Sequence, residues 1–163
     1  TIYDFQEWFV GQRAQPPVDR ILFPTDGRAN DQVIDALDTA DLIVLTPSNP
    51  YLSIDPMLSL KNLSDAWERR RCPCVAVSPI VGQQAVKGPL AELIDQLANR
   101  PASAQAVVDY YGKRVDGWVI QYGDELTTSI PVFETQTLMT TPQRRKNLAR
   151  AVLDWAQTLG SGA

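Results

Sequence analysis

The sequence predicts an α/β fold built on a mainly parallel sheet, because short apolar runs alternate with segments of helical periodicity along the chain. Parallel strands that are buried on both faces are continuous apolar runs, and helices normally connect them. The expected strands are residues 20–23, 42–45, 75–78, 118–121 and 132–137. The expected helices are residues 32–39, 57–70, 89–98, 103–111 and 142–159. This order predicts a three-layer, Rossmann-like sandwich with helices on both faces of the sheet.

Proline marks the starts of three expected helices. It occurs in the pairs Asp55-Pro56, Gly88-Pro89 and Thr141-Pro142, each with a capping or flexible residue before it. Proline suits the first helical turn because its fixed φ is already helical and the N–H that it lacks would be unpaired there. A chain of 163 residues, 44% of them hydrophobic, can bury one core. We therefore expect residues 1–163 to form a single α/β domain.

Composition and charge exclude several classes of function. The 15 Lys and Arg against 19 Asp and Glu give a net charge of -4, which disfavours a nucleic-acid or anionic membrane surface. No apolar run approaches the roughly 20 residues that a membrane-spanning helix needs. The chain has no histidine, so it cannot supply a Ser-His-Asp triad, a Cys-His pair or a histidine zinc site. We expect a cytoplasmic protein whose partners include neither nucleic acid nor a membrane.

The first candidate binding segment is the loop at residues 46–56, which follows the expected strand 42–45. In an open parallel sheet, ligands bind beyond the carboxyl ends of the strands. Prolines stiffen this loop, while Ser48, Asn49 and Ser53 offer short hydrogen-bonding groups to a ligand. The same residue types are ordinary in turns and helix caps, so a purely structural turn is the alternative.

The second candidate segment, residues 78–89, follows the expected strand 75–78. Gly82 and Gly88 permit close approach of a ligand to the backbone, Lys87 adds a positive charge, and the expected helix beginning near Pro89 offers free amides. Together these features suit a phosphate. The loop is not a Walker A motif, because Lys87 precedes Gly88 and no Ser or Thr follows it. The alternative is a solvated lysine beside a helix start.

Together the two loops resemble those of the 2-phospho-L-lactate transferase family of deazaflavin coenzyme biosynthesis. That family has G-P-S-N-P followed by S-I-x-P, and then S-P-I-[IV]-G-G-x-A-x-K-G-P after the next strand. The matching residues are Thr46, Pro47, Ser48, Asn49, Pro50, Ser53, Ile54, Pro56, Ser78, Pro79, Ile80, Val81, Gly82, Ala85, Lys87, Gly88 and Pro89. The resemblance extends over nearly the whole chain, from DFQEWFV to NLARAVLDWA. Thr46 and Gln83 depart from it, since each stands where the family has glycine.

The resemblance implies an enzyme that moves a phospholactyl or related three-carbon phosphoacid group. The donor is activated by guanosine diphosphate, the acceptor is a deazaflavin, and magnesium binds at the phosphates. Because the resemblance begins about midway through the family's length, the chain is expected to be the C-terminal half of a longer protein. The magnesium ligands are then expected in the N-terminal half. This chain alone is expected to be inactive, and it is a possible homodimer.

The substrate-binding residues implied by the resemblance come from both loops. They are Thr46, Pro47, Ser48, Asn49, Pro50, Ser53, Ser78, Pro79, Gly82, Lys87 and Gly88. Ser48, Asn49 and Ser53 are expected to contact the nucleotide or the acceptor, and Lys87 with the two glycines to contact the diphosphate. One alternative is a nucleotide-sugar-binding regulatory protein of the related gluconeogenesis-factor kind. Another is a fragment that only packs and dimerises.

Three further groups of residues have mainly structural interpretations. Cys72 and Cys74 lack the additional ligands of a zinc site and are expected to be small residues entering a buried strand. Arg144, Arg145 and Lys146 lie at the start of the last expected helix, where positive charge opposes the helix dipole. They are interpreted as solubilising charge, with an anionic partner as the alternative. The four tryptophans are expected to be core or interface anchors rather than stacking platforms, and they are Trp8, Trp67, Trp118 and Trp155.

Replacing Lys87 tests the second loop in the full-length parent protein. If the ammonium contacts a diphosphate, Lys87→Ala removes a charge-assisted contact worth about 1.5 to 3 kcal/mol. Affinity for guanosine diphosphate should then fall about tenfold to a hundredfold and weaken further as salt rises. Calorimetric titration of wild type and variant at two salt concentrations measures this. Equal affinities would remove Lys87 from the site.

Overall fold

The computed structural model describes residues 1–24, 26–82, 84–86 and 88–160. Four strands form one fully parallel sheet in the order β1-β2-β5-β6. They are β1 (Ile43–Leu45), β2 (Cys74–Val77), β5 (Gly117–Gln121) and β6 (Val132–Thr135). The register pairs Val44 with Val75, Ala76 with Trp118, and Val119 with Phe133. The expected parallel sheet is confirmed.

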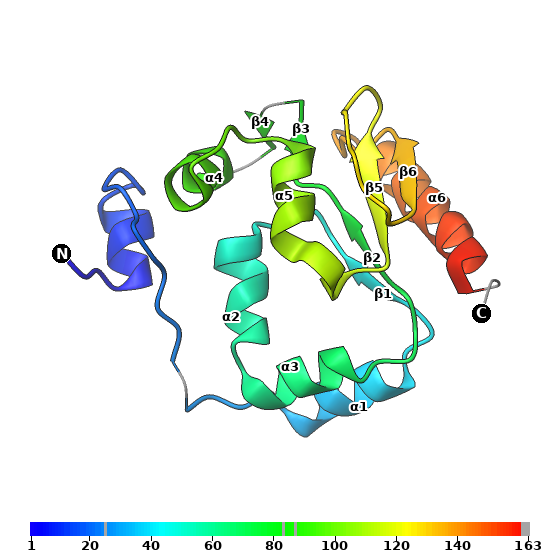
Figure 1. The fold of residues 1–163 in the computed structure, drawn as a ribbon, viewed down its shortest axis with the longest axis horizontal. Helices are drawn as coiled ribbons and strands as arrows, with labels where there is room; N and C mark the ends of the chain where they lie inside the picture. Colours follow the sequence, from blue (N-terminus) through cyan, green and yellow to red (C-terminus); the bar gives the residue numbers. More distant parts are fainter. Residues whose placement is uncertain (25, 83, 87, 161–163) are drawn as a thin grey trace.

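Helices and a small hairpin connect these strands (Figure 1). The helices are η1 (Glu7–Gly11), α1 (Asp31–Thr39), η2 (Pro50–Ile54), α2 (Asp55–Leu58), α3 (Lys61–Glu68), α4 (Leu90–Ala98), α5 (Ala104–Tyr111), η3 (Gly112–Arg114) and α6 (Pro142–Gly160). The hairpin, which follows β2, pairs β3 (Ile80–Val81) with β4 (Gln84–Ala85). Pro142 begins α6 as expected, whereas Pro56 is the second residue of α2 and Pro89 precedes α4.

The sheet lies between two layers of helices, with α6 on one side and α2 and α5 on the other (Figure 1). Successive strand residues point to opposite faces. Val75, Val77 and Val119 therefore pack in one cluster with residues of α6, namely Leu148, Val152 and Ala156. The intervening residues Cys74, Ala76 and Trp118 join a larger cluster that includes residues of α4 and α5. This arrangement confirms the three-layer sandwich.

Two predicted elements are wrong. Residues 20–23 form no strand, because Pro16, Pro17 and Pro24 flank them and proline cannot donate to a strand ladder. The expected helix at residues 57–70 is instead α2 and α3, separated where Leu60 adopts an extended conformation. The hydroxyl of Ser59 donates to the carbonyl of Pro56 at 2.8 Å, a local bond of the kind that competes with helix continuation. The last expected strand also ends early, at Thr135.

The polar contacts of Arg70 fix the C-terminal end of α3 to the sheet. Its guanidinium donates to the carbonyl of Trp67 at 3.0 Å and pairs with the Asp116 carboxylate at 2.9 Å. The same Asp116 oxygen accepts the Cys74 N–H at 2.8 Å. Cys74 is fully buried, and burial raises the pKa of its thiol to about 12. Its structural role at the start of β2 agrees with the prediction.

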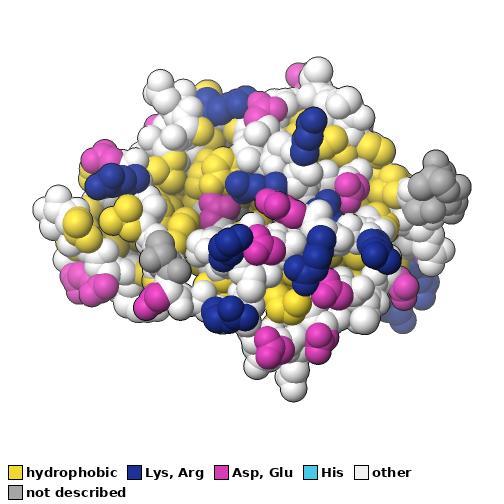
Figure 2. Space-filling model, turned by 60° about the horizontal axis from the view of Figure 1, so that its bottom comes forward, with side chains coloured by type: hydrophobic (Ala, Val, Ile, Leu, Met, Phe, Trp, Pro, Cys, Tyr) yellow, Lys and Arg dark blue, Asp and Glu magenta, His cyan; other side chains and the backbone are white. Residues whose placement is uncertain are grey.

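The face that carries α1 and α3 shows both signs of charge interspersed (Figure 2). Lys61 pairs with Asp65 within α3 at 2.9 Å, and Arg69 pairs with Asp38 of α1 at 2.9 Å. Exposed pairs of this kind contribute little to stability. In the part of the chain that the structure describes, no helix combines the length and apolar character needed to cross a membrane.

At Gly117, side chains of α6 pack directly against the backbone of β5. A Cβ atom there would lie 2.7 Å from Cη2 of Trp155 and 2.9 Å from Cδ1 of Leu159. Trp155 also stacks on Phe133 at a centroid distance of 5.5 Å, which limits its freedom to move aside. Gly117→Ala should therefore reduce the free energy of unfolding by about 1 to 3 kcal/mol, as overpacking does. Urea denaturation measures this change.

Gly11→Ala is the matched control for this prediction. The three atoms nearest to a Cβ at Gly11 belong to the Glu7 carboxylate, at 2.9 to 3.0 Å. This flexible end is held by an exposed hydrogen bond from Gln12 and can rotate away. The control should leave stability nearly unchanged. Equal effects of the two substitutions would contradict close packing of α6 at Gly117.

Candidate functional site

A groove of about 980 Å³ lies at the carboxyl edge of the sheet. Both predicted loops line it, which confirms that they share one edge, as the parallel neighbours β1 and β2 require. Three other segments complete the walls: Phe5 and Phe9 near the N-terminus, residues 137–140 after β6, and Arg145 of α6.

The structure places most of the predicted site residues in this groove. Those lining it are Pro47, Ser48, Asn49, Ser53, Ser78, Pro79 and Gly88. Thr46, Pro50 and Gly82 are described but lie outside its lining, and Pro50 is almost fully buried. Lys87, and Gln83 beside Gly82, lie outside the described residues, so the expectations for them stay predictions.

The first loop leads directly into η2, a π-helical turn. Asn49 caps this turn: its side-chain oxygen accepts the N–H groups of Tyr51 at 3.0 Å and Leu52 at 3.2 Å. The alternative given for this loop, a purely structural turn, is therefore found at Asn49, because its side-chain oxygen accepts two backbone N–H groups. Single π turns inside helical segments occur frequently at functional sites.

The second loop begins with a turn that Ser78 stabilises. Ser78 is 1% exposed, and its hydroxyl donates to the carbonyl of Ile80 at 3.0 Å while accepting the N–H of Ile80 at 3.2 Å. Its own N–H donates to Val119 of β5 at 2.9 Å. Gly82 and Gly88 adopt φ of 62° and 68°, a region that favours glycine. Ser78 thus shapes the loop through contacts within the protein.

Asp124, in the loop after β5, is a site residue that the sequence did not indicate. Its Oδ1 accepts the N–H of Gly82 at 2.7 Å and so ties the β5 loop to the second candidate loop. Its Oδ2 is buried and has no hydrogen-bond partner among the described residues. Burial, the first cause, and the nearby charge of Glu134 raise the pKa of this carboxyl, while the Gly82 N–H opposes the shift.

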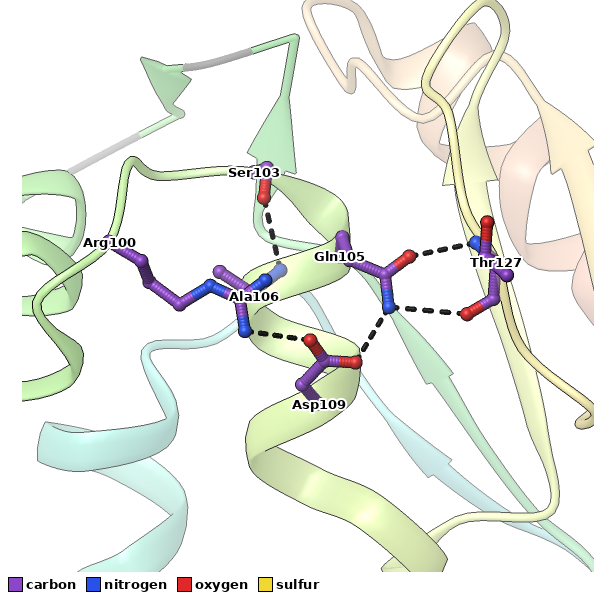
Figure 3. A network of polar contacts seen from close by, with 6 residues as sticks. All are labelled: Arg100, Ser103, Gln105, Ala106, Asp109 and Thr127. Atoms are coloured by element: carbon purple, nitrogen blue, oxygen red, sulfur yellow. Dashed lines mark hydrogen bonds and ion pairs between the residues drawn. The ribbon is translucent and has the colours of Figure 1, made fainter.

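The β5 loop is in turn attached to α5 through Gln105 (Figure 3). The Gln105 amide donates to the carbonyl of Thr127 at 3.2 Å and accepts the Thr127 N–H at 2.8 Å. It also donates to Asp109, which pairs with Arg100 at 2.7 Å.

The Ser103 hydroxyl caps the start of α5 by accepting the Ala106 N–H at 3.0 Å. These contacts link the body of α5, through Thr127 and Asp124, to Gly82.

Thr137 holds the segment after β6 in the groove wall. It is 5% exposed, and both its N–H and its hydroxyl donate to Oε1 of Gln121, at 2.9 Å and 3.0 Å. Gln121 is the last residue of β5, and β6 ends at Thr135. The side chain of Gln121 therefore takes the place of the strand pairing that would have held Thr137 if the expected strand 132–137 had formed. The rule that identified the first two loops, applied to the end of β5, would have pointed to the loop that holds Asp124. It would not have pointed to Thr137, which was expected inside the last strand.

Apolar side chains form much of the groove wall that the structure describes, and hydroxyl and amide side chains form the rest together with one arginine. Arg145 is the charged side chain among its described lining residues. Within the described ranges, no group of three or more His, Cys, Asp or Glu side chains could hold a metal ion. The described residues therefore suit an anionic ligand and do not by themselves form a magnesium site.

Comparison with known proteins identifies the family of this chain. A family model described as 2-phospho-L-lactate transferase CofD matches residues 1–150. The chain belongs to this family. The match includes both loops, the β5 loop with Asp124 and the start of α6 with Arg145.

Individual family members are similar over almost all of this chain. A phosphoenolpyruvate transferase of Mycolicibacterium smegmatis is 31% identical over an alignment of 160 residues, and the match covers 93% of this chain and 49% of that protein. A 2-phospho-L-lactate transferase of Haloarcula marismortui is 33% identical over 150 residues, which are 91% of this chain and 44% of that protein. A phosphoenolpyruvate transferase of Mycobacterium tuberculosis H37Rv is 33% identical over an alignment of 160 residues. The match covers 93% of this chain and 48% of that protein. The chain spans about half the length of the curated relatives it matches.

The raised pKa of Asp124 predicts a pH-dependent effect on stability. An acid whose pKa is raised by folding contributes stability that is fully present below its ordinary pKa of 3.8 and is lost as pH rises through the folded-state value. Asp124→Asn keeps an oxygen acceptor for Gly82 but carries no charge. It should exceed wild type in free energy of unfolding at pH 7, by a margin that shrinks as pH falls toward 3.8.

Urea denaturation at several pH values between 4 and 7 measures this margin. Asp154→Asn, at an exposed position of α6, controls for the loss of one negative charge. A margin for Asp124→Asn that grows as the pH is lowered would contradict the assignment.

Proposed function

We propose that this chain is the C-terminal half of a transferase that moves a phospholactyl or related three-carbon phosphoacid group. The donor is activated by guanosine diphosphate, and the acceptor is a deazaflavin hydroxyl. The main support is that both loops implied by the family resemblance line one groove at the carboxyl edge of the sheet. Relatives named for phosphoenolpyruvate and for 2-phospho-L-lactate support a three-carbon phosphoacid as the transferred group.

The groove suits the nucleotide end of such a donor. Its volume of about 980 Å³ lies near the upper end of the usual range for small-molecule sites. Ser48 and Ser53 line one part of it, and Gly88 and Leu90 lie where α4 begins. Free amides at a helix start favour phosphate groups. The phosphates are therefore assigned to the second loop and the start of α4.

The proposed reaction needs positioning and electrostatic stabilisation more than covalent catalysis. The acceptor oxygen attacks the phosphorus next to the three-carbon acid, its hydroxyl proton is lost, and the bond from that phosphorus to the nucleotide phosphate breaks. Catalysis of phosphoryl transfer is largely positioning and charge stabilisation. A chain without histidine can contribute to both.

Magnesium is proposed to act at the donor phosphates, with ligands from the other half of the parent protein. The residues described here form no metal-binding cluster and so do not fit a complete magnesium site. The parent protein is further proposed to be cytoplasmic and a possible homodimer, with small-molecule substrates rather than nucleic acid or membrane as its partners.

Turnover measured on the 163-residue chain and on the full-length parent tests this proposal. With donor, acceptor and magnesium present, the parent should form product and the isolated chain should not, because half of the proposed site is supplied elsewhere. Product formation by the isolated chain would overturn the division of the site. A parent that binds guanosine diphosphate but never transfers the phosphoacid group would instead favour a regulatory nucleotide-binding protein.

A further inference from the structure

We propose that Arg145 binds an oxyanion of the donor in the groove and so contributes to substrate specificity. This inference rests on the proposed function and names a residue for recognition of the donor. Two groups of the donor share the required chemistry: its phosphates and the carboxylate of the three-carbon acid.

Arg145 is the arginine found among the described residues that line the groove. It is the fourth residue of α6, its N–H donates to the carbonyl of Thr141 at 3.1 Å, and its exposed side chain lines the groove. Neighbouring Arg144 points its guanidinium at the hydroxyl of Thr140 instead, at 3.1 Å. Adjacent arginines on one turn therefore have different environments.

The guanidinium of Arg145 has no acidic partner in the described part of the chain. The ion pairs found there engage Lys61, Arg69, Arg70, Arg100 and Arg114. None of the described groove residues is acidic. A cation that lines a groove without a neighbouring carboxylate is available to an anionic ligand.

The local charge makes this placement unfavourable in the absence of an anion. Arg144, Arg145 and Lys146 lie in the opening turns of α6, and its first turn contains no acidic residue. Positive charge near a helix N-terminus is repelled by the helix dipole. A bound oxyanion would offset this repulsion. For Arg145, which lines the groove, we therefore favour anion binding over a role as solubilising charge.

Arginine also has suitable geometry for the proposed ligand. Its planar guanidinium can donate two parallel hydrogen bonds to a carboxylate or phosphate, whereas a lysine ammonium acts as a point charge. The other walls of the groove contribute the hydroxyl residues Ser48 and Ser53 and the backbone of Gly88. Among the described lining residues, the loops would thus offer uncharged hydrogen-bonding groups to the substrate, and Arg145 of α6 would offer a positive charge.

Titration calorimetry of the full-length parent with two ligands tests this inference and separates the two anion sources. Guanosine diphosphate has phosphates but no carboxylate, whereas the guanosine diphosphate-activated phosphoacid donor has both. Arg145→Gln should weaken binding of the donor about tenfold to a hundredfold, the loss expected for one charge-assisted contact. An equal loss for guanosine diphosphate assigns Arg145 to a phosphate, and a loss confined to the donor assigns it to the carboxylate.

Matched variants distinguish binding from folding. Arg150→Gln changes the same residue type on the same helix at an exposed position outside the groove, so it should leave both affinities unchanged. Arg145→Lys should recover only part of the affinity. Thermal unfolding of Arg145→Gln should equal or exceed that of wild type, because removing charge near the start of α6 relieves repulsion.

The outcomes also separate this inference from the proposed function. If wild type binds both ligands and Arg145→Gln binds them equally well, Arg145 is excluded while the proposed function stands. If wild type binds neither ligand, the proposed function fails and the inference fails with it. An equal loss in Arg145→Gln and Arg150→Gln would indicate a general charge effect and overturn the specific contact.

Discussion

Parallel pairing of β2 with β1 on one side and β5 on the other is the constraint on which the rest of the structure depends. Because these strands and β6 run in the same direction, every loop that follows a strand leaves the sheet at one edge. The hydrogen bond from Ser78 to Val119 extends this pairing one residue beyond β2. The groove is therefore a consequence of strand direction, and its walls come from segments distant in sequence.

Side-chain contacts hold the loops around the groove where strand pairing ends. Gln105 fixes Thr127, Asp124 fixes Gly82, and Gln121 fixes Thr137, each through hydrogen bonds to backbone groups. Loops outside a strand ladder need such partners for their backbone N–H and C=O groups. An α5 residue therefore contributes to the shape of a groove that it does not line.

Local patterns in the sequence predicted the sheet and most helices but not the contacts that form between distant residues. Apolar runs identified β1, β2, β5 and β6, because buried parallel strands are recognisable from their own residues. The run at residues 20–23 has similar composition, and only its flanking prolines and the absence of a strand partner separate it from a true strand. For the site, the two loops were found by their position after strands. Asp124 was not found, since its significance depends on its contact with Gly82. Arg145 was noted for an anionic partner only as an alternative, since its place depends on a groove formed by tertiary packing.

Because the Gly82 N–H donates to Asp124, hydrogen exchange at this amide reports whether the second loop stays in place. Gly82 is exposed and lies outside the β3–β4 ladder, so its N–H depends on a single carboxylate 42 residues away for protection from solvent. Hydrogen exchange at such an amide follows local opening and does not require global unfolding. Exchange at Gly82, compared with exchange at the buried Trp118 amide of β5, would therefore distinguish opening of the second loop from loss of the fold.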